Sequence, residues 1–293
     1  MAASPLIRWH DQKRAEQLTN PILVVATEGW IDAGLGAATA LAAVLAQVDT
    51  GVVASFDADE LIDHRARRPV LRIVDGVNTS LAWPDIALRA GHDSAGADLI
   101  LLVGPEPDMR WRAFTHTVVE TAQELGVRML LGLGAFPAPV PHTRPTRLAS
   151  TASSPELAGQ VGFVPGTIDV PAGIQAALER AFADAGIPAI GLWARVPHYA
   201  AAMPYPAASA ALVEGLTAVG GLTLSAGDLH AAADRTSTQI DQLIANSEEH
   251  TAMVAQLEEQ IDAAEGQSGF DLRTLPSGDE IAAELERYLR GQG

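Results

Sequence analysis

The feature that most constrains the fold of this chain is an apolar run of strand length, Pro21-Ile-Leu-Val-Val-Ala-Thr27. Its apolar residues do not alternate with polar ones and several are β-branched, which is typical of a strand buried on both faces. An alanine- and leucine-rich segment, Leu35 to Val48, predicts a helix, and a second apolar run, Val52 to Phe56, follows it. Strand, helix and strand in this order form a right-handed βαβ unit, so the sequence predicts a parallel sheet.

The same pattern continues along the chain. Further apolar runs predict strands over residues 99–103, 127–136 and 187–196. Helical segments are predicted over residues 109–125, 171–185 and 204–220. Strands that alternate with helices favour an α/β fold with a mostly parallel central sheet. We place this core in residues 1–222.

The region from 70 to 92 has a different pattern. Val70 to Val74 and Leu81 to Trp83 flank an Asp75-Gly76 turn signal, which predicts a β-hairpin inserted between strands of the core. An exposed hairpin leaves strand edges unpaired. We therefore expect this hairpin to contact another subunit.

The last part of the chain, residues 223–293, predicts a helical subdomain. Ser225-Ala-Gly-Asp228 fits a capping box, and mostly apolar residues, with polar interruptions, then recur at four-three spacing from Leu229 to Ala264. This pattern predicts one long helix. Residues 266–276 form a linker, and a second capping box at Ser277 opens a terminal helix. The resulting helical hairpin could be a lid, an oligomerisation element or a packing element.

Composition excludes several classes of function. The net charge of −17 argues against nucleic acid and anionic membrane surfaces as partners, because both require a basic patch. The chain has no cysteine, which excludes disulfides and thiolate chemistry. No apolar run is long enough to cross a membrane, and residues 1–11 contain no signal-peptide core, so we expect a cytoplasmic protein.

Candidate ligand-binding residues gather in the loops that follow the predicted strands. Ligands of open α/β sheets bind outside the carboxyl ends of the strands. Those loops are residues 28–34, 57–69, 104–110, 137–145 and 196–203. The candidates that they carry are Glu28, Trp30, Asp32, Asp57, Asp59, Glu60, His64, Arg65, Arg68, Glu106, Arg110, His142 and His198.

The densest of these loops is Phe56-Asp-Ala-Asp-Glu-Leu-Ile-Asp-His-Arg-Ala-Arg-Arg-Pro69. Its carboxylates could hold Mg²⁺ or another hard cation. Arg65, Arg67 and Arg68 could instead neutralise them in a salt-bridge network, and we favour this interpretation, with no metal site. His64 could act as a general base or as a hydrogen-bonded structural residue.

Motifs of known chemistry are absent from the sequence. Gly34-Leu-Gly36-Ala-Ala-Thr39 resembles a dinucleotide loop, but its third glycine is Thr39, and Glu28 and Asp32 precede it. A pyrophosphate would require bare amides there. The chain contains no G-x-S-x-G elbow and no H-E-x-x-H pair. We expect no cofactor, and the catalytic residues, if any, stay unassigned.

Four motifs taken together resemble the actinobacterial branch of the PAC2 family, which is named for a proteasome assembly chaperone. They are Glu28-Gly-Trp-Ile-Asp-Ala-Gly34, the stretch from Phe56 to Pro69, Gly104-Pro-Glu-Pro-Asp108 and Leu133-Gly-Ala-Phe136. The resemblance covers roughly residues 5–220. It implies a three-layer α/β/α sandwich, similar to purine nucleoside phosphorylases and peptidyl-tRNA hydrolases. It also implies a homo-oligomer, a trimer, with a helical C-terminal addition.

The resemblance leads to two hypotheses about function. In the first, the protein is an oligomeric interaction module of the assembly-chaperone kind with a ligand-sized crevice. The chain ends Arg290-Gly-Gln-Gly293, without the hydrophobic-Tyr-X ending through which archaeal relatives dock on proteasomes, so we expect no such docking.

In the second hypothesis, the protein is a hydrolase or phosphorylase-like enzyme that acts on a small polar substrate under the C-terminal helices. Glu28, Asp32, Asp59 and His64 would then be acid/base or metal candidates. Arg65, Arg68 and Arg110 would hold an anionic group.

Overall fold

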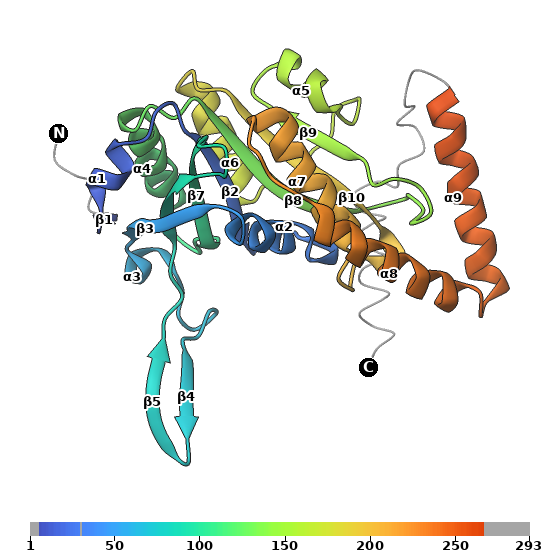
Figure 1. Cartoon of the computed structure of the whole chain (residues 1–293), viewed down its shortest axis with the longest axis horizontal. Coiled ribbons are helices and arrows are strands. Elements are labelled where there is room, and N and C mark those ends of the chain that lie inside the picture. The colour runs from blue at the N-terminus through green and yellow to red at the C-terminus, as the bar shows by residue number, and fades with distance from the viewer. Residues whose placement is uncertain (1–5, 30, 267–293) are drawn as a thin grey trace.

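The computed structural model describes residues 6–29 and 31–266. Its centre is an eight-stranded sheet with the order β1-β3-β6-β7-β2-β8-β10-β9 (Figure 1). The strands of this sheet are β1 (Ile7–Trp9), β2 (Ile22–Glu28), β3 (Asp49–Phe56), β6 (Ala87–His92), β7 (Asp98–Pro105), β8 (Met129–Ala138), β9 (Leu148–Ala152) and β10 (Ala189–Pro197).

The four central strands, β7, β2, β8 and β10, are parallel to one another. Strand β6 is antiparallel to both β7 and β3, so β3 runs in the same direction as the central strands. The predicted parallel core is therefore confirmed. The simple βαβ unit is not, because β6 and β7 lie between β2 and β3.

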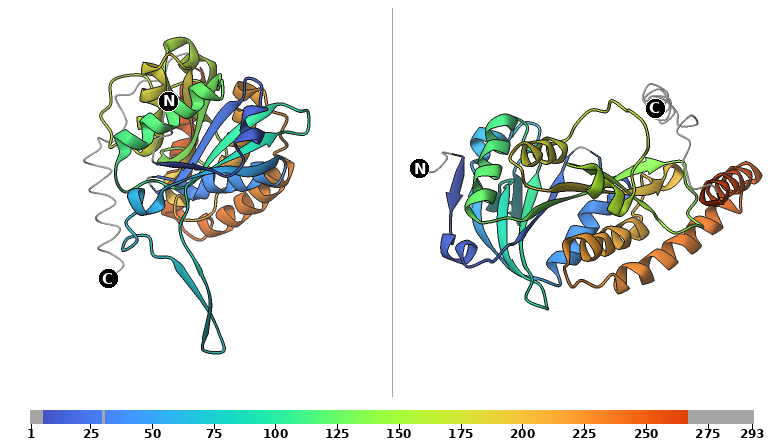
Figure 2. Two further views of the ribbon diagram at one scale, coloured as in Figure 1. Left: turned by 90° about the vertical axis from the view of Figure 1, so that its left-hand side faces the viewer. Right: turned by 90° about the horizontal axis from the view of Figure 1, so that it is seen from above.

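Helices cover both faces of the sheet and complete the predicted three-layer α/β/α sandwich (Figure 2). The helices of one layer are α2 (Gly36–Leu45), α7 (Pro206–Gly220) and α8 (Gly227–Ile244). The opposite layer contains α4 (Trp111–Glu124) and α6 (Ile174–Asp184). The remaining helices are α1 (Gln12–Glu16), α3 (Ala58–Leu61), α5 (Pro155–Val161) and α9 (Glu248–Gly266), with short 3₁₀ turns at Ala33–Leu35 and His198–Ala200.

Strand β2 shows why the sheet is buried on both faces. Ile22, Val24 and Ala26 contribute to the core beneath α2 and α7. Leu23 and Val25 point into the core beneath α4 and α6. Each of the valine, leucine and isoleucine side chains stabilises the fold by about 1.5–3 kcal/mol when it leaves water. A run without polar residues is therefore the expected sequence for this central strand.

The predicted hairpin forms a two-stranded arm of its own, made of β4 (Val70–Val74) and β5 (Val77–Ala82). It extends away from the body of the molecule (Figure 1). The predicted boundary at residue 92 was wrong, because Ala87–His92 form β6 in the main sheet. Pro84 cannot donate to a ladder, and Ile86 after it is fully buried, so the chain re-enters the body there.

The C-terminal region contains two helices where the heptad pattern predicted one. Helix α8 ends at Ile244 and α9 begins at Glu248. The backbone N–H of His250 donates to the Ser247 hydroxyl over 3.3 Å, as at a helix N-cap. The predicted linker and terminal helix after Gly266 lie outside the described residues. No helix in the described part of the chain is long and apolar enough to cross a membrane.

Candidate functional site

The predicted candidates lie at the carboxyl edge of the sheet, but they form two separate polar clusters. One, which we call the arm-base cluster, joins the segment before the arm to the loop after β7. The other, which we call the helix clasp, joins the loop after β8 to α8 and α9. Asp32, Glu28 and Glu106 lie outside both clusters. The residues of the arm-base cluster are Asp57, Asp59, Glu60, Asp63, His64, Arg67, Asp108 and Arg110.

The arm-base cluster begins at Asp57, which caps α3. Its Oδ1 accepts hydrogen bonds from the backbone N–H groups of Asp59 (3.1 Å) and Glu60 (3.3 Å). Carboxylates are favoured at this position because they satisfy amides that have no partner within the helix. Asp57 is therefore used structurally and not as a free acid.

Salt bridges then attach this segment to the loop after β7. Glu60 pairs with Arg110, and Nε of Arg67 lies 3.3 Å from Oδ1 of Asp108. Asp108 also accepts a hydrogen bond from the backbone N–H of Asp63 over 2.9 Å. The salt-bridge interpretation of the acidic stretch thus agrees with the contacts, although two of the expected cations differ.

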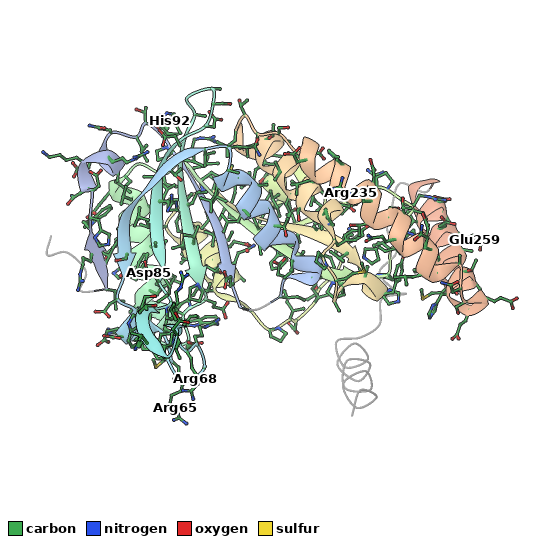
Figure 3. The ribbon with its side chains drawn as sticks, turned by 60° about the horizontal axis from the view of Figure 1, so that its bottom comes forward. Arg65, Arg68, Asp85, His92, Arg235 and Glu259 are labelled. Carbon is green, nitrogen blue, oxygen red and sulfur yellow. The ribbon has the colours of Figure 1, made fainter. Side chains whose placement is uncertain are left out.

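Arg65 and Arg68 were expected to neutralise these acids, and the structure corrects this. Both side chains are exposed and point away from the body of the protein (Figure 3). The arginines that pair with acids in this cluster are Arg67 and Arg110. Two cations therefore remain exposed beside the base of the arm.

His64 connects the cluster to the arm itself. Its Nε2 lies 3.1 Å from Oδ1 of Asp59, and its ring meets Trp83 edge-on at 4.9 Å. Trp83 directly follows β5. Nδ1 of His64 is buried and has no hydrogen-bond partner among the described residues. The ring therefore contacts its neighbours through Nε2 and through its edge-on packing against Trp83.

Two acids between the clusters cap helices. Asp32 accepts hydrogen bonds from the backbone N–H groups of Ala37 (2.7 Å) and Ala38 (2.9 Å) in α2. Burial raises the pKa of its carboxyl, against the effect of these amides. Glu106 accepts from the backbone N–H of Ile174, the first residue of α6, over 2.7 Å. Glu28 is exposed, and Trp30 lies outside the described residues.

The helix clasp is centred on His142, whose side chain is 1% exposed. Its backbone N–H donates to the Tyr199 hydroxyl over 2.8 Å, and the same hydroxyl lies 2.8 Å from Nδ1. Nε2 lies 3.0 Å from Oδ1 of Asp241 in α8. A neutral ring satisfies these contacts when Nε2 donates to Asp241 and Nδ1 accepts from the tyrosine. Burial raises the pKa of Tyr199 to about 12, so its hydroxyl keeps its proton.

The clasp continues onto α9. Arg144 forms a two-point contact with Asp262, at 2.8 and 2.7 Å, and also lies 3.0 Å from Glu258. Such bidentate pairs hold both partners in a fixed orientation. His198, the last predicted candidate, is exposed and packs edge-on against Tyr199 at 5.3 Å. The clasp thus holds both C-terminal helices to the carboxyl edge.

A buried acid that the sequence analysis did not single out lies on α6, on the side that packs against β9 and β10. Glu179 accepts hydrogen bonds from Thr151 (2.7 Å) and Gln175 (3.2 Å). Burial raises the pKa of Glu179 to about 7. A Cβ at Gly191 would lie 2.2 Å from its Oε1. Glycine inside an apolar strand marks a close approach of another group, and this was the signal available in the sequence.

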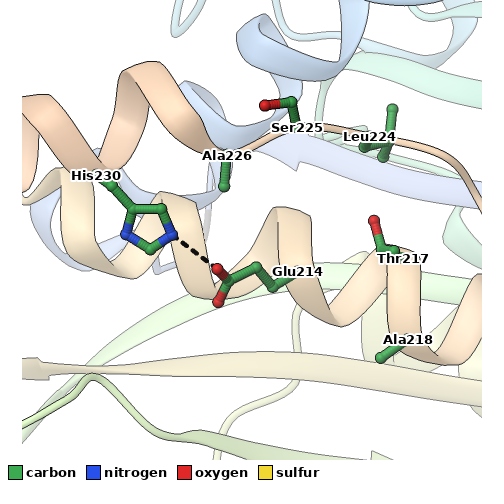
Figure 4. A pocket seen from close by; sticks show the side chains of 7 residues that line it. All are labelled: Glu214, Thr217, Ala218, Leu224, Ser225, Ala226 and His230. Carbon is green, nitrogen blue, oxygen red and sulfur yellow. Dashed lines mark hydrogen bonds and ion pairs between the residues drawn. The ribbon is translucent and has the colours of Figure 1, made fainter.

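Two open hollows of the described part of the chain lie away from both clusters. One, of about 410 Å³, lies between α7 and the start of α8, where His230 contacts Glu214 over 2.7 Å (Figure 4). Another involves Asp49 and Asp98, which begin β3 and β7, and is therefore at the amino edge. The predicted crevice at the carboxyl edge stays a prediction. Within the described residues, no three acids or histidines are grouped so that they could hold a metal ion.

Comparisons with known proteins agree with this architecture. The sequence pattern of the PAC2 family matches residues 26–244. No curated protein matches the chain. A solved structure from Corynebacterium glutamicum, of unknown function, is 31% identical with a TM-score of 0.81, and the alignment covers 88% of this chain and 97% of that one.

Two structures from Mycobacterium tuberculosis are also similar. One, of unknown function, is 36% identical with a TM-score of 0.78, over 90% of this chain and 92% of that one. The other is described as a proteasome-assembly chaperone homologue. It is 34% identical with a TM-score of 0.74, over 80% of this chain and 99% of that one. These organisms are actinobacteria, the branch that the sequence motifs indicated.

Proposed function

Because this chain belongs to the PAC2 family, we propose that it works as an oligomeric protein-interaction module of the assembly-chaperone kind. Its interaction element is the β4–β5 arm. The M. tuberculosis relative described as a proteasome-assembly chaperone homologue supports this kind of function. The trimeric state that the sequence motifs imply is part of the proposal.

The observation that carries the proposal is the composition of the arm. Every residue of β4 and β5 is exposed. Seven large apolar side chains in and directly after the two strands are 44–70% exposed: Val70, Leu71, Ile73, Val74, Val77, Leu81 and Trp83. An isolated two-stranded hairpin is marginal in water. A contiguous exposed apolar surface of this kind marks an interaction site.

Both faces of the arm carry apolar side chains. Leu71 pairs with Leu81 across the ladder, and Val74 pairs with Val77. Along β4, alternate residues point to opposite faces, so Leu71 and Ile73 lie on one face while Val70 and Val74 lie on the other. A partner that covered the arm would therefore remove apolar surface from water on two sides.

The contacts of the arm-base cluster are suited to holding both ends of the arm in position. Its salt bridges hold the segment before β4 to the loop after β7, and His64 contacts Trp83 after β5. Anchoring both ends of the arm reduces the freedom that the arm loses when it binds. On this account the acids of the segment from Phe56 to Pro69 hold the arm in place and do not take part in a reaction.

The enzyme hypothesis gains no comparable support. Among the described candidates, Asp57 and Asp32 cap helices, Glu106 accepts from the first amide of α6, and Glu60 pairs with Arg110. General bases and metal ligands need accessible lone pairs. These four carboxylates use lone pairs on backbone amides or arginine, whereas Glu28 and Asp59 are exposed.

The test is the mass of the protein in solution, measured by light scattering after size exclusion. The full chain should elute at three times the monomer mass. Replacing Ile73 and Leu81 with aspartate (I73D/L81D) should give a folded monomer. The control pair Q239D/Q242D adds the same charge at exposed positions of α8, away from the arm, and should leave the trimer intact. A full chain that is monomeric, or an I73D/L81D variant that still assembles, would overturn the proposal.

A further inference from the structure

Two arginines lie next to each other at the carboxyl ends of β8 and β10. The backbone N–H of Arg195 in β10 donates to the carbonyl of Arg147, which directly precedes β9, over 3.1 Å. On its other side, Arg195 is in register with Phe136 of β8. Residues in register on neighbouring strands point to the same face of a sheet. We call Arg147, Arg195 and Phe136, which follow one another across the sheet, the arginine row.

The ring of Trp193 lies beside the arginine row. Trp193 is two residues before Arg195 in β10, so both side chains point to the same face. A Cβ at Gly134 of β8 would lie 2.4 Å from the ring, so the ring covers this glycine. Its Nε1 donates to the Thr151 hydroxyl over 3.0 Å. Trp193 and Phe136 are both half-buried, so part of each ring is open to a ligand.

Helix α6 covers this face of the sheet only as far as the tryptophan. Gln175, its second residue, packs on Gly132 of β8, where a Cβ would lie 2.3 Å from the amide nitrogen of the glutamine. Glu179, one turn further along α6, packs on Gly191 of β10 in the same way. Along both strands the arginine row lies on the carboxyl side of these glycines. It is therefore beyond the N-terminus of α6.

The strands that carry the row are basic in an acidic protein. The chain has a net charge of −17, but residues 125–155 and 185–213, which include β8, β9 and β10, contain no aspartate or glutamate. Burial lowers the pKa of Arg195, and the charge of Arg147 lowers it further. An oxyanion that contacts both guanidinium groups would offset this repulsion.

Acids near these strands come from other elements. Glu179 of α6 accepts two hydrogen bonds, Glu258 and Asp262 of α9 bind Arg144, and Asp169, between α5 and α6, is exposed. A guanidinium has five N–H donors. Each arginine of the row can therefore donate to a ligand in addition to a neighbour within the protein.

We propose that the arginine row and Trp193 bind a small ligand in which a flat ring carries a carboxylate or phosphate group. The oxyanion accepts hydrogen bonds from Arg147 and Arg195, because planar guanidinium groups match the oxygen spacing of both anions. The ring of the ligand packs against Trp193 and Phe136. All of these residues belong to one chain, so a monomer can bind the ligand.

The test is isothermal titration calorimetry of the full chain with benzoate, phenyl phosphate, benzamide and inorganic phosphate. Benzoate or phenyl phosphate should bind at millimolar concentrations or below, and the tighter of the two identifies the oxyanion. Benzamide has the ring of benzoate without its charge, and inorganic phosphate has the charge without a ring. Each should bind at least about tenfold more weakly than its partner probe, because each lacks one set of contacts.

Three variants locate the site. Arg147→Gln and Arg195→Lys should each lower the affinity for the tighter probe by about tenfold, since a hydrogen bond to a charged group contributes this much. Arg195→Lys keeps the charge and removes the planar fork. Arg112→Gln changes an exposed arginine of α4 and is the matched control, which should bind like the wild type. Circular dichroism checks that each variant is folded.

Several results would overturn the proposal. If neither benzoate nor phenyl phosphate binds, or if benzamide binds as tightly as benzoate, the row is not an oxyanion site. If R147Q and R195K bind the tighter probe as the wild type does, the probe binds elsewhere. If inorganic phosphate binds as tightly as phenyl phosphate, the two rings take no part. Arg147 is exposed, so R147Q decides the matter even if R195K fails to fold.

Discussion

The two polar clusters at the carboxyl edge use the same residue types for different tasks. The arm-base cluster is exposed, draws most of its members from one short segment, and holds an apolar arm that projects into solvent. The helix clasp surrounds a buried histidine and joins residues about a hundred positions apart in sequence. The clasp should therefore contribute more to stability, while the arm-base cluster should contribute more to assembly.

The largest effect on the free energy of unfolding is expected at Glu179, a buried acid outside both clusters. The pKa of Glu179 is raised by burial to about 7, above its value in the unfolded chain. The native state then holds the proton more strongly, so stability is fully present below pH 4.5 and falls as the pH rises to about 7. The difference in unfolding free energy between wild type and E179Q should change by about 3 kcal/mol over that window. A pH-independent difference in urea titrations would contradict it.

Removing the centre of the clasp should have the next largest effect. His142→Ala leaves the Tyr199 hydroxyl and the Asp241 carboxylate without a buried partner. The free energy of unfolding should fall by about 2 kcal/mol. His198→Ala, the exposed neighbour, is the matched control and should change it by less than about 0.5 kcal/mol. Equal losses for the two variants in chemical denaturation would mean that the clasp contributes nothing specific.

Loss of the α3 cap should be smaller. Asp57→Ala removes the acceptor for two backbone amides, and the unfolding free energy should fall by about 1 kcal/mol. The same variant should also weaken the trimer, because the segment that mounts the arm loses order. A loss of stability without any loss of assembly would separate the arm-base cluster from the arm.

Asp59→Asn should have the smallest effect on stability. The Asp59 side chain is 90% exposed, and its one ion pair among the described residues is with His64. Exposed pairs contribute no more than about 0.5 kcal/mol. Asp57→Asn is the comparison, since it keeps the shape but weakens the cap. A larger loss for D59N than for D57N would reverse the roles that the contacts assign.

The sequence predicted the parts of the fold that depend on local patterns. Unbroken apolar runs identified β2, β7, β8 and β10 because each is buried on both faces. The order of the strands was not predictable in this way, since nothing in the pattern of β3 says that β6 lies between it and β7. The heptad spacing continued across the break between α8 and α9, and the polar residues Ser247 and His250 at heptad positions were the sequence signal for it.

The candidate site, too, was predictable from the sequence only in part. The acids and arginines of the segment from Phe56 to Pro69 were predictable as a salt-bridge cluster, because they are neighbours in sequence. The choice of Arg67 over Arg65 and Arg68 was not, since it depends on where Asp108 lies after β7. The helix clasp could not be predicted from the sequence, because His142 and Asp241 meet only where α8 crosses the carboxyl edge.

The central claim is that the apolar arm is covered when the protein assembles. Hydrogen–deuterium exchange of residues 70–82, followed at several protein concentrations, tests it most directly. We predict slow exchange in the arm at concentrations where light scattering finds a trimer, and fast exchange after dilution to monomer, with β2 protected throughout. An arm that exchanges at the unprotected rate within the intact trimer would contradict the account.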